Sequence, residues 1–145
     1  MTFLLDTNVL IYSLDPRDIP KRNRARAVLE HVVERSNAAL PSQVLAEFAN
    51  VSLRKLGFAP DQSYRQVERF ELLFAVYPLV PALVLEALRG VKDHSFSYYD
   101  AQIWAAAKLY QVPIVLSEDF SGGATVEGVT FLNPFSESFD LSHLA

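Results

Sequence analysis

Four acidic side chains stand at positions where an ordinary solvent-facing acid is not expected. Asp6 directly follows the apolar run Phe3–Leu5, and Asp119 follows the apolar run Ile114–Leu116 after two residues. Because ligands of parallel sheets bind beyond the carboxyl ends of the strands, both acids would project where a site is expected. Each acid alone also fits a helix N-cap or a turn, and that alternative stays open.

The other two acids fall on apolar helix faces. Glu47 lies three residues after Val44 and four before Val51, inside the apolar stripe of its predicted helix. Asp100 leads an apolar face that continues at Ile103. An ionised carboxylate on an inward face requires a cation or hydrogen-bond donors, because burying it unpaired is costly.

Both helix acids also have structural explanations. A glutamate at the edge of an apolar stripe can pair with an arginine or a lysine. Ser97-x-x-Asp100 matches a capping box, in which the acid folds back onto the start of its own helix.

Taken together, the four acids predict a metal site. Like charges at close range do not all stay ionised near pH 7 unless a cation cancels them. With no cysteine and three histidines in the chain, carboxylate oxygens favour Mg²⁺ or Mn²⁺ over zinc. The chemistry that such a site implies is metal-assisted hydrolysis of a phosphodiester bond.

Apolar runs and helical stripes alternate along the chain, which predicts the elements that must position these acids. Strands are predicted at Phe3–Leu5, Ala38–Leu40, Ile114–Leu116 and Val129–Leu132, with an edge strand or no regular strand at Ala75–Val80. Helices are predicted at Val9–Leu14, Lys21–Arg35, Ser42–Leu56, Pro60–Phe74, Pro81–Gly90 and Tyr98–Tyr110. This alternation is typical of an α/β fold with a mostly parallel sheet, in one domain spanning residues 1–145.

Composition is that of an ordinary globular protein, and the absence of cysteine is compatible with a reducing cytosol. The 145 residues carry a formal net charge of −4, which argues against binding of nucleic acid through overall basicity but permits a local basic patch. The first apolar run is short and has no basic lead-in, so neither a signal peptide nor a membrane helix is expected.

Four motifs in order resemble those of PIN-domain ribonucleases, most closely the VapC-type toxins of toxin–antitoxin modules. They are Leu4–Leu10 (LLDTNVL), Gln43–Phe48 (QVLAEF), Tyr98–Ile103 (YYDAQI) and Leu116–Phe120 (LSEDF). The resemblance covers nearly the whole chain. It implies a three-layer α/β/α fold with a parallel central sheet, and a Mg²⁺-dependent endoribonuclease activity.

By position, the resemblance also implies roles for single residues. Asp6, Glu47, Asp100 and Asp119 correspond to the family's acidic quartet. We expect Asp6, Asp100 and Asp119 to be the main metal ligands, and Glu47 to act through a water of the ion. Three polar neighbours are expected to support the site by hydrogen bonding: Thr7, Asn8 and Ser117. Glu118 could add a further ligand, but a residue adjacent to a ligand normally points elsewhere, so we expect it to point into solvent.

The resemblance further implies three partners: an RNA substrate, a second copy of the chain in a homodimer, and a small antitoxin that blocks the site, often with an arginine. Candidate contacts to RNA are Arg22, Arg24, Arg26, Arg54, Lys55, Arg65 and Arg69, all of which also fit solvated helix faces. Phe70, Phe74 and Tyr77 fit either an exposed association patch or, as we favour, the core.

Other function classes compete with this hypothesis. A PIN-like scaffold without activity would be expected to lack one or more of the acids, and an RNA-processing nuclease without a toxin role stays open. A haloacid-dehalogenase-type phosphatase requires Asp-x-Asp, whereas Asn8 stands at the third position here. A receiver domain requires a lysine after a late strand, whereas Ser-Glu-Asp without a lysine follows Leu116 here. Binding of a nucleotide cofactor is not expected either, because no Gly-rich phosphate loop follows the first strand.

Overall fold

The computed structural model describes residues 1–120 and 122–145, in which strands and helices alternate as predicted. The strands are β1 (Phe3–Leu5), β2 (Ala38–Pro41), β3 (Ala75–Tyr77), β4 (Ile114–Leu116), β5 (Thr125–Val126) and β6 (Val129–Leu132). The α-helices are α1 (Thr7–Tyr12), α2 (Ile19–Glu34), α3 (Ser42–Arg54), α4 (Pro60–Leu73), α5 (Pro81–His94) and α6 (Tyr98–Leu109). A 3₁₀ turn, η1 (Leu141–Leu144), follows near the C-terminus.

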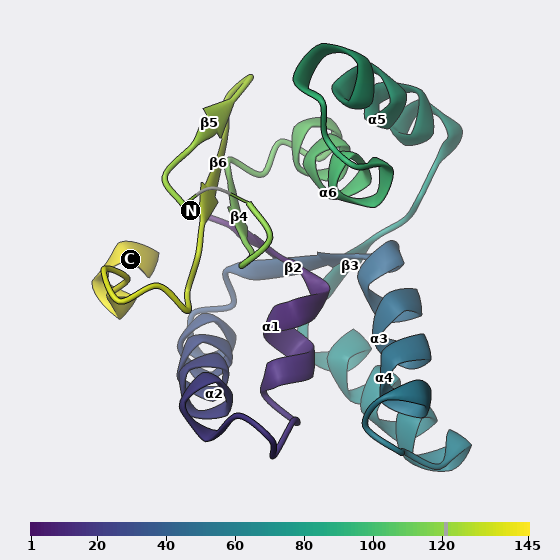
Figure 1. Cartoon of the computed structure of the whole chain (residues 1–145), viewed down its shortest axis with the longest axis vertical. Coiled ribbons are helices and arrows are strands. Elements are labelled where there is room, and N and C mark those ends of the chain that lie inside the picture. Colours follow the sequence, from purple (N-terminus) through teal and green to yellow (C-terminus); the bar gives the residue numbers. More distant parts are fainter. Residues whose placement is uncertain (121) are drawn as a thin grey trace.

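The strands form one sheet between two helical layers. Within the described residues its order is β3-β2-β1-β4-β6-β5, and every neighbouring pair is parallel except the β5–β6 hairpin. Figure 1 shows α1 to α4 on one side of the sheet and α5 and α6 on the other. The predicted α/β class, with its mostly parallel sheet, is therefore confirmed.

The order of the strands reverses between β1 and β4. From β1 the chain adds β2 and then β3 on one side, and it later returns to add β4 and β6 on the other. Ligands of open α/β sheets bind at such a reversal, beyond the carboxyl ends of the strands. The register pairs Leu5 of β1 with Leu116 of β4, so Asp6 and Ser117 emerge side by side at this point.

The core lies on both faces of the sheet. All of β1 is buried. Phe48, Trp104 and Phe131 are among the largest fully buried side chains of the core. Phe70 and Phe74 are buried, as we favoured, whereas half-buried Tyr77 stacks on Tyr110 with ring centroids 4.5 Å apart. Among the described residues, no helix combines the length and the apolar character that crossing a bilayer requires.

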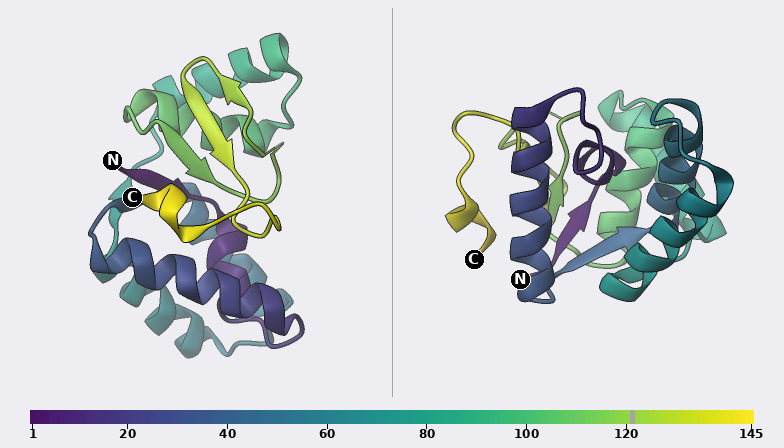
Figure 2. Two further views of the ribbon diagram at one scale, coloured as in Figure 1. Left: turned by 90° about the vertical axis from the view of Figure 1, so that its left-hand side faces the viewer. Right: turned by 90° about the horizontal axis from the view of Figure 1, so that it is seen from below.

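The C-terminal tail was not predicted in detail. Strand β5 has two residues and η1 has four, lengths at which apolar periodicity carries no signal. Figure 2 shows η1 lying against α2. The guanidinium of Arg24 donates to the carbonyl of Phe139 at 3.1 Å, so one of the predicted RNA contacts instead ties the tail to α2.

The predicted end of α5 at Gly90 is wrong. A glycine near the end of a helical pattern predicts a C-terminus there, but α5 continues to His94 and ends where Ser95 adopts a left-handed conformation. Gly90 is needed for close packing instead. A Cβ atom added at this position would lie 2.7 Å and 2.8 Å from two ring carbons of the buried Trp104.

Replacing Gly90 by Ala is therefore expected to destabilise the protein by about 1–2 kcal/mol. Overpacking a rigid core costs roughly 1–3 kcal/mol, and the higher helix propensity of alanine returns up to about 1 kcal/mol. Chemical denaturation measures the change. In a Trp104→Phe background the cost should shrink, because the clashing ring carbons are gone. A Gly90→Ala variant that unfolds at the wild-type denaturant concentration would contradict this account.

Candidate active site

A cleft of about 360 Å³ opens where β1 and β4 end. Three of the four predicted acids line it, each from a different part of the chain: Asp6 after β1, Glu47 on α3 and Asp119 after β4. Thr7 and Asn8, from the first turn of α1, line it as well. The topological reversal of the sheet thus brings together residues separated by more than 100 positions.

Asp6 is deeply buried in this cleft, with 4% of the residue exposed. It caps α1, as the alternative explanation expected, because one carboxylate oxygen accepts from the backbone amide of Thr7 at 2.7 Å. The other oxygen accepts from the hydroxyl of Ser117, also at 2.7 Å. Burial raises the pKa of Asp6 to about 7, against the two hydrogen bonds, and the charges of Asp119 and Glu47 add to the rise.

Glu47 is oriented by neutral donors. The hydroxyl of Thr7 donates to one of its oxygens at 2.9 Å, and the amide of Gln43, one turn earlier on α3, donates to the other at 2.6 Å. Gln43 also donates to the carbonyl of Tyr99 and accepts from the buried Gln102 of α6. The expected alternative, a pairing of Glu47 with arginine or lysine, is wrong.

Asn8 and Ser117 hold the segment that carries Asp119. The amide nitrogen of Asn8 donates to a carboxylate oxygen of Asp119 at 3.2 Å, and the backbone amide of Asp119 donates to the Ser117 hydroxyl oxygen at 3.0 Å. Partial burial raises the pKa of Asp119, and the nearby charges of Asp100, Glu118 and Glu47 act in the same direction.

Asp100 occupies the first turn of α6 and does not line the cleft of the other three acids. Its charge is nevertheless close enough to raise the pKa of Asp119. The capping-box explanation for this acid is wrong, because the side chain of Ser97 makes no hydrogen bond at the start of α6.

Glu118 differs from its expectation. Its side chain is 23% exposed, and it is bonded by Lys21 and Tyr12 rather than pointing freely into solvent. The Glu118 side chain therefore lies toward α1 and α2, beside the Tyr12 that lines the cleft.

The acid cluster suits a cation. Among the ion pairs of the described residues, none involves Asp6, Glu47, Asp100 or Asp119. Its donor atoms are carboxylate oxygens, the ligands of hard divalent ions. Within the same residues, no three acidic or histidine side chains stand close enough together to hold one ion in this structure.

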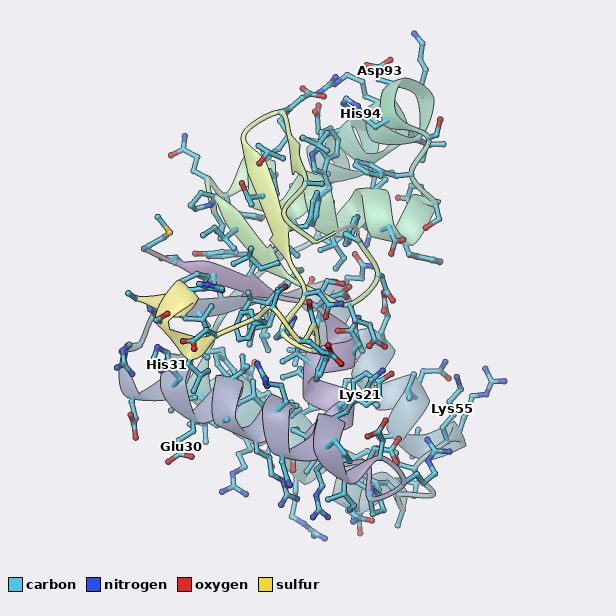
Figure 3. The ribbon with its side chains drawn as sticks, turned by 60° about the vertical axis from the view of Figure 1, so that its left-hand side comes forward. Lys21, Glu30, His31, Lys55, Asp93 and His94 are labelled. Atoms are coloured by element: carbon cyan, nitrogen blue, oxygen red, sulfur yellow. The ribbon has the colours of Figure 1, made fainter. Side chains whose placement is uncertain are left out.

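Sequence reasoning assigned no role to Gln43, Asp15 or Arg17, which the structure places at the site. Gln43 stands four residues before Glu47, a spacing that places both on one helix face and that could have indicated their hydrogen bond. Lys55 and the Arg17–Asp15 pair line the cleft at its outer side. Figure 3 labels Lys55, whose side chain extends outward from the end of α3.

Comparison with known proteins agrees with this architecture. Curated protein sequences give no match. The fold resembles a toxin–antitoxin complex chain from Klebsiella pneumoniae, at 18% identity over 92% of this chain and 98% of that one (TM-score 0.68). It also resembles the sarcin–ricin loop cleaving toxin VapC20 of Mycobacterium tuberculosis, at 18% identity over 87% and 98% (TM-score 0.66). VapBC-1 of nontypeable Haemophilus influenzae matches at 16% identity over 94% and 100% (TM-score 0.61).

These likenesses concern the fold, because the identities are low. A family profile adds a match at the level of sequence: the profile described as the PIN domain fits residues 3–121. That range contains all four acids and the strands that deliver Asp6 and Asp119 to one cleft. The chain therefore belongs to the PIN domain family.

Proposed function

We propose that this protein is a Mg²⁺-dependent endoribonuclease, able to use Mn²⁺, and the toxin of a type II toxin–antitoxin module. The observation that carries the proposal is the set of acids around the cleft. A buried carboxylate, Asp6, shares this cleft with Glu47 and Asp119, and neutral groups alone donate to these acids in the described structure. Membership in the PIN domain family supports the same interpretation.

Asp6, Asp100 and Asp119 would hold the cation, and Glu47 would act through water. When bound, Mg²⁺ supplies the positive charge that activates a water and stabilises the leaving oxygen of the phosphodiester. The rise in the pKa of Asp6 to about 7 supports a cation at this place, because a nearby positive charge favours the ionised carboxylate that burial disfavours.

The supporting residues would fix the acids before substrate arrives. Ser117 and the Thr7 amide each donate to one oxygen of Asp6, which prevents rotation of its carboxylate. The hydroxyl of Thr7 sets the direction of Glu47, and Asn8 that of Asp119. Such partners are needed because a ligand displaced by about 1 Å loses much of its catalytic value.

Contacts to the RNA backbone would come from the rim of the cleft. Lys55 lines it and makes no ion pair in the described residues, so its ammonium is available to a phosphate. Arg17 lines the cleft too, but Asp15 holds its guanidinium at 2.8 Å. Arg65 and Arg69 are exposed on α4 and fit a solvated helix face equally well.

We infer the partners by analogy with the structural relatives. The Klebsiella pneumoniae and Haemophilus influenzae structures are toxin–antitoxin pairs, and VapC20 is a toxin that cleaves the sarcin–ricin loop. By analogy, we propose a small antitoxin that blocks the acids with a basic side chain, a homodimer of this chain, and action in the cytoplasm.

A cleavage assay against total RNA tests the proposal. With Mg²⁺ or Mn²⁺ the protein is expected to produce discrete RNA fragments, and excess EDTA should stop the cleavage. Adding Mg²⁺ beyond the EDTA should restore it. Cleavage that persists in EDTA would overturn the metal mechanism. Binding of RNA without cleavage under all metal conditions would favour the inactive scaffold, and cleavage without growth arrest on expression would favour an RNA-processing nuclease.

A further inference from the structure

Glu118 joins three segments that are distant in sequence. The hydroxyl of Tyr12, in the last turn of α1, donates to one of its carboxylate oxygens at 2.5 Å. The ammonium of Lys21, on α2, donates to the other oxygen at 2.8 Å and to the Tyr12 hydroxyl at 3.3 Å. The loop after β4 is thereby bonded to α1 and α2 at once. We call these three residues the Tyr12–Lys21–Glu118 clamp.

Lys21 is held more firmly than an ordinary surface lysine. Its ammonium lies 4.6 Å from the centroid of the Tyr12 ring and 5.8 Å from that of Phe135. These two rings pack edge to face, with centroids 5.0 Å apart. Lys21, labelled in Figure 3, thus sits on α2 against an aromatic pair that limits its rotation. The Lys21 ammonium is therefore held where it faces Glu118.

The clamp acts on the same loop as Asn8 does. The side-chain oxygen of Asn8 accepts from the backbone amide of Glu118 at 3.4 Å, while its nitrogen donates to Asp119. Asn8 and Tyr12 are four residues apart on α1 and so lie on one face of that helix. One face of α1 therefore contacts the loop twice. Tyr12 bonds the side chain of Glu118, and Asn8 bonds the backbone amide of Glu118 and the side chain of Asp119.

We propose that the Tyr12–Lys21–Glu118 clamp is a positioning device that holds the loop carrying Asp119 beside Asp6, so that the acids need less rearrangement to bind a cation. This inference rests on the proposed function, because it assigns Asp119 to cation binding. Glu118 is then an anchor rather than a metal ligand. Its two carboxylate oxygens are engaged by Tyr12 and Lys21, and the charge of Lys21 offsets that of Glu118 beside the acid cluster.

Replacing Lys21 by Met distinguishes two effects of the lysine on cation affinity, its charge and its positioning of the loop, because they predict changes of opposite sign. Removing a positive charge near carboxylates strengthens cation binding through simple electrostatics. If the lysine holds the loop, its loss instead releases Asp119 and weakens cation binding. We expect the second result, with the affinity for Mn²⁺ lowered about tenfold, the size of effect typical of residues that orient metal ligands. Electron paramagnetic resonance of free Mn²⁺ measures the affinity, and exposed Lys92→Met is the matched control.

Tyr12→Phe removes one hydroxyl and leaves the net charge, the ring and its contact with Lys21 in place. In metal-free protein we expect the backbone amides of Glu118 and Asp119 to exchange hydrogen about tenfold faster, because a charge-assisted bond that restrains their loop is gone. Tyr64→Phe, at a tyrosine that is 69% exposed, is the control and should leave this exchange unchanged. Circular dichroism and the melting temperature verify that each variant is folded.

The two measurements separate the clamp from the proposed function. Faster exchange at Glu118 and Asp119 in Tyr12→Phe, together with weaker Mn²⁺ binding in Lys21→Met, supports the clamp. Wild-type exchange in Tyr12→Phe, or Mn²⁺ binding that is unchanged or tighter in Lys21→Met, overturns it. If the wild-type protein itself binds no Mn²⁺, the metal mechanism fails, and the exchange experiment still decides whether the clamp restrains the loop.

Discussion

An Asp6→Asn variant is expected to lose Mg²⁺-dependent RNA cleavage by a factor of at least about one hundred. Replacing residues that only orient metal ligands costs roughly 10–100-fold, so loss of a ligand at the centre of the cleft should cost more. The amide keeps the shape of the side chain but removes its negative charge and one acceptor oxygen. Single-turnover cleavage of RNA at saturating Mg²⁺ measures the effect.

The matched control for this variant is Asp61→Asn. Asp61 is an exposed acid in the first turn of α4, away from the cleft, and its neutralisation changes the net charge by the same amount. It should cleave RNA at the wild-type rate. Wild-type cleavage by a folded Asp6→Asn protein would exclude Asp6 from the reaction and remove the basis of the proposed function.

In the metal-free protein, the contribution of Asp6 to the free energy of unfolding is expected to fall as pH rises from about 4 to about 7. In the unfolded chain Asp6 ionises near the ordinary aspartate pKa of 3.8, whereas burial keeps the folded carboxyl protonated up to a pKa of about 7. Over this window the native state binds more protons than the unfolded state, so the free energy of unfolding falls with pH and levels off above it. The full difference is on the order of 4 kcal/mol.

Asp6→Asn isolates this contribution from the other titrating groups. Several carboxylates act in the opposite direction; hydrogen bonds from Arg89 above all hold the pKa of Glu127 below its usual range, which favours folding at higher pH. The difference in unfolding free energy between Asp6→Asn and the wild type should therefore be measured at each pH by denaturant titration. From pH 4 to pH 8, the unfolding free energy of the variant should rise relative to that of the wild type. The Asn amide is a poor match for the Thr7 and Ser117 donors, which adds a cost that does not depend on pH.

A divalent cation should offset the fall in the free energy of unfolding that ionisation of Asp6 causes in the wild type. At pH 8 and a free Mg²⁺ concentration one hundred times its dissociation constant, the wild-type protein is expected to gain about 2.7 kcal/mol, and Asp6→Asn much less. A wild-type curve that runs parallel to that of Asp6→Asn across the whole pH range would show that the Asp6 carboxyl is not perturbed by folding.

The sequence by itself predicted the layers of this fold and the face on which each acid stands. Runs such as Ile114–Leu116 and the stripe around Glu47 report burial directly, because the periods of strands and helices are local properties of the chain. The same local reasoning failed at Gly90, whose small size serves a ring that lies fourteen residues further along, in α6. It also missed β5 and η1, which are too short to show a period.

Only the tertiary structure decided what each acid touches. Glu47 is bonded by Thr7, 40 residues away, and Asp6 by Ser117, 111 residues away. The position of Asp100 near Asp119 and the engagement of Glu118 by Lys21 likewise depend on how the strands and helices pack. Spacing along the chain determines which way a side chain faces on its own element. Its partners are set by the neighbouring elements, and in this protein those neighbours meet because the strand order reverses between β1 and β4.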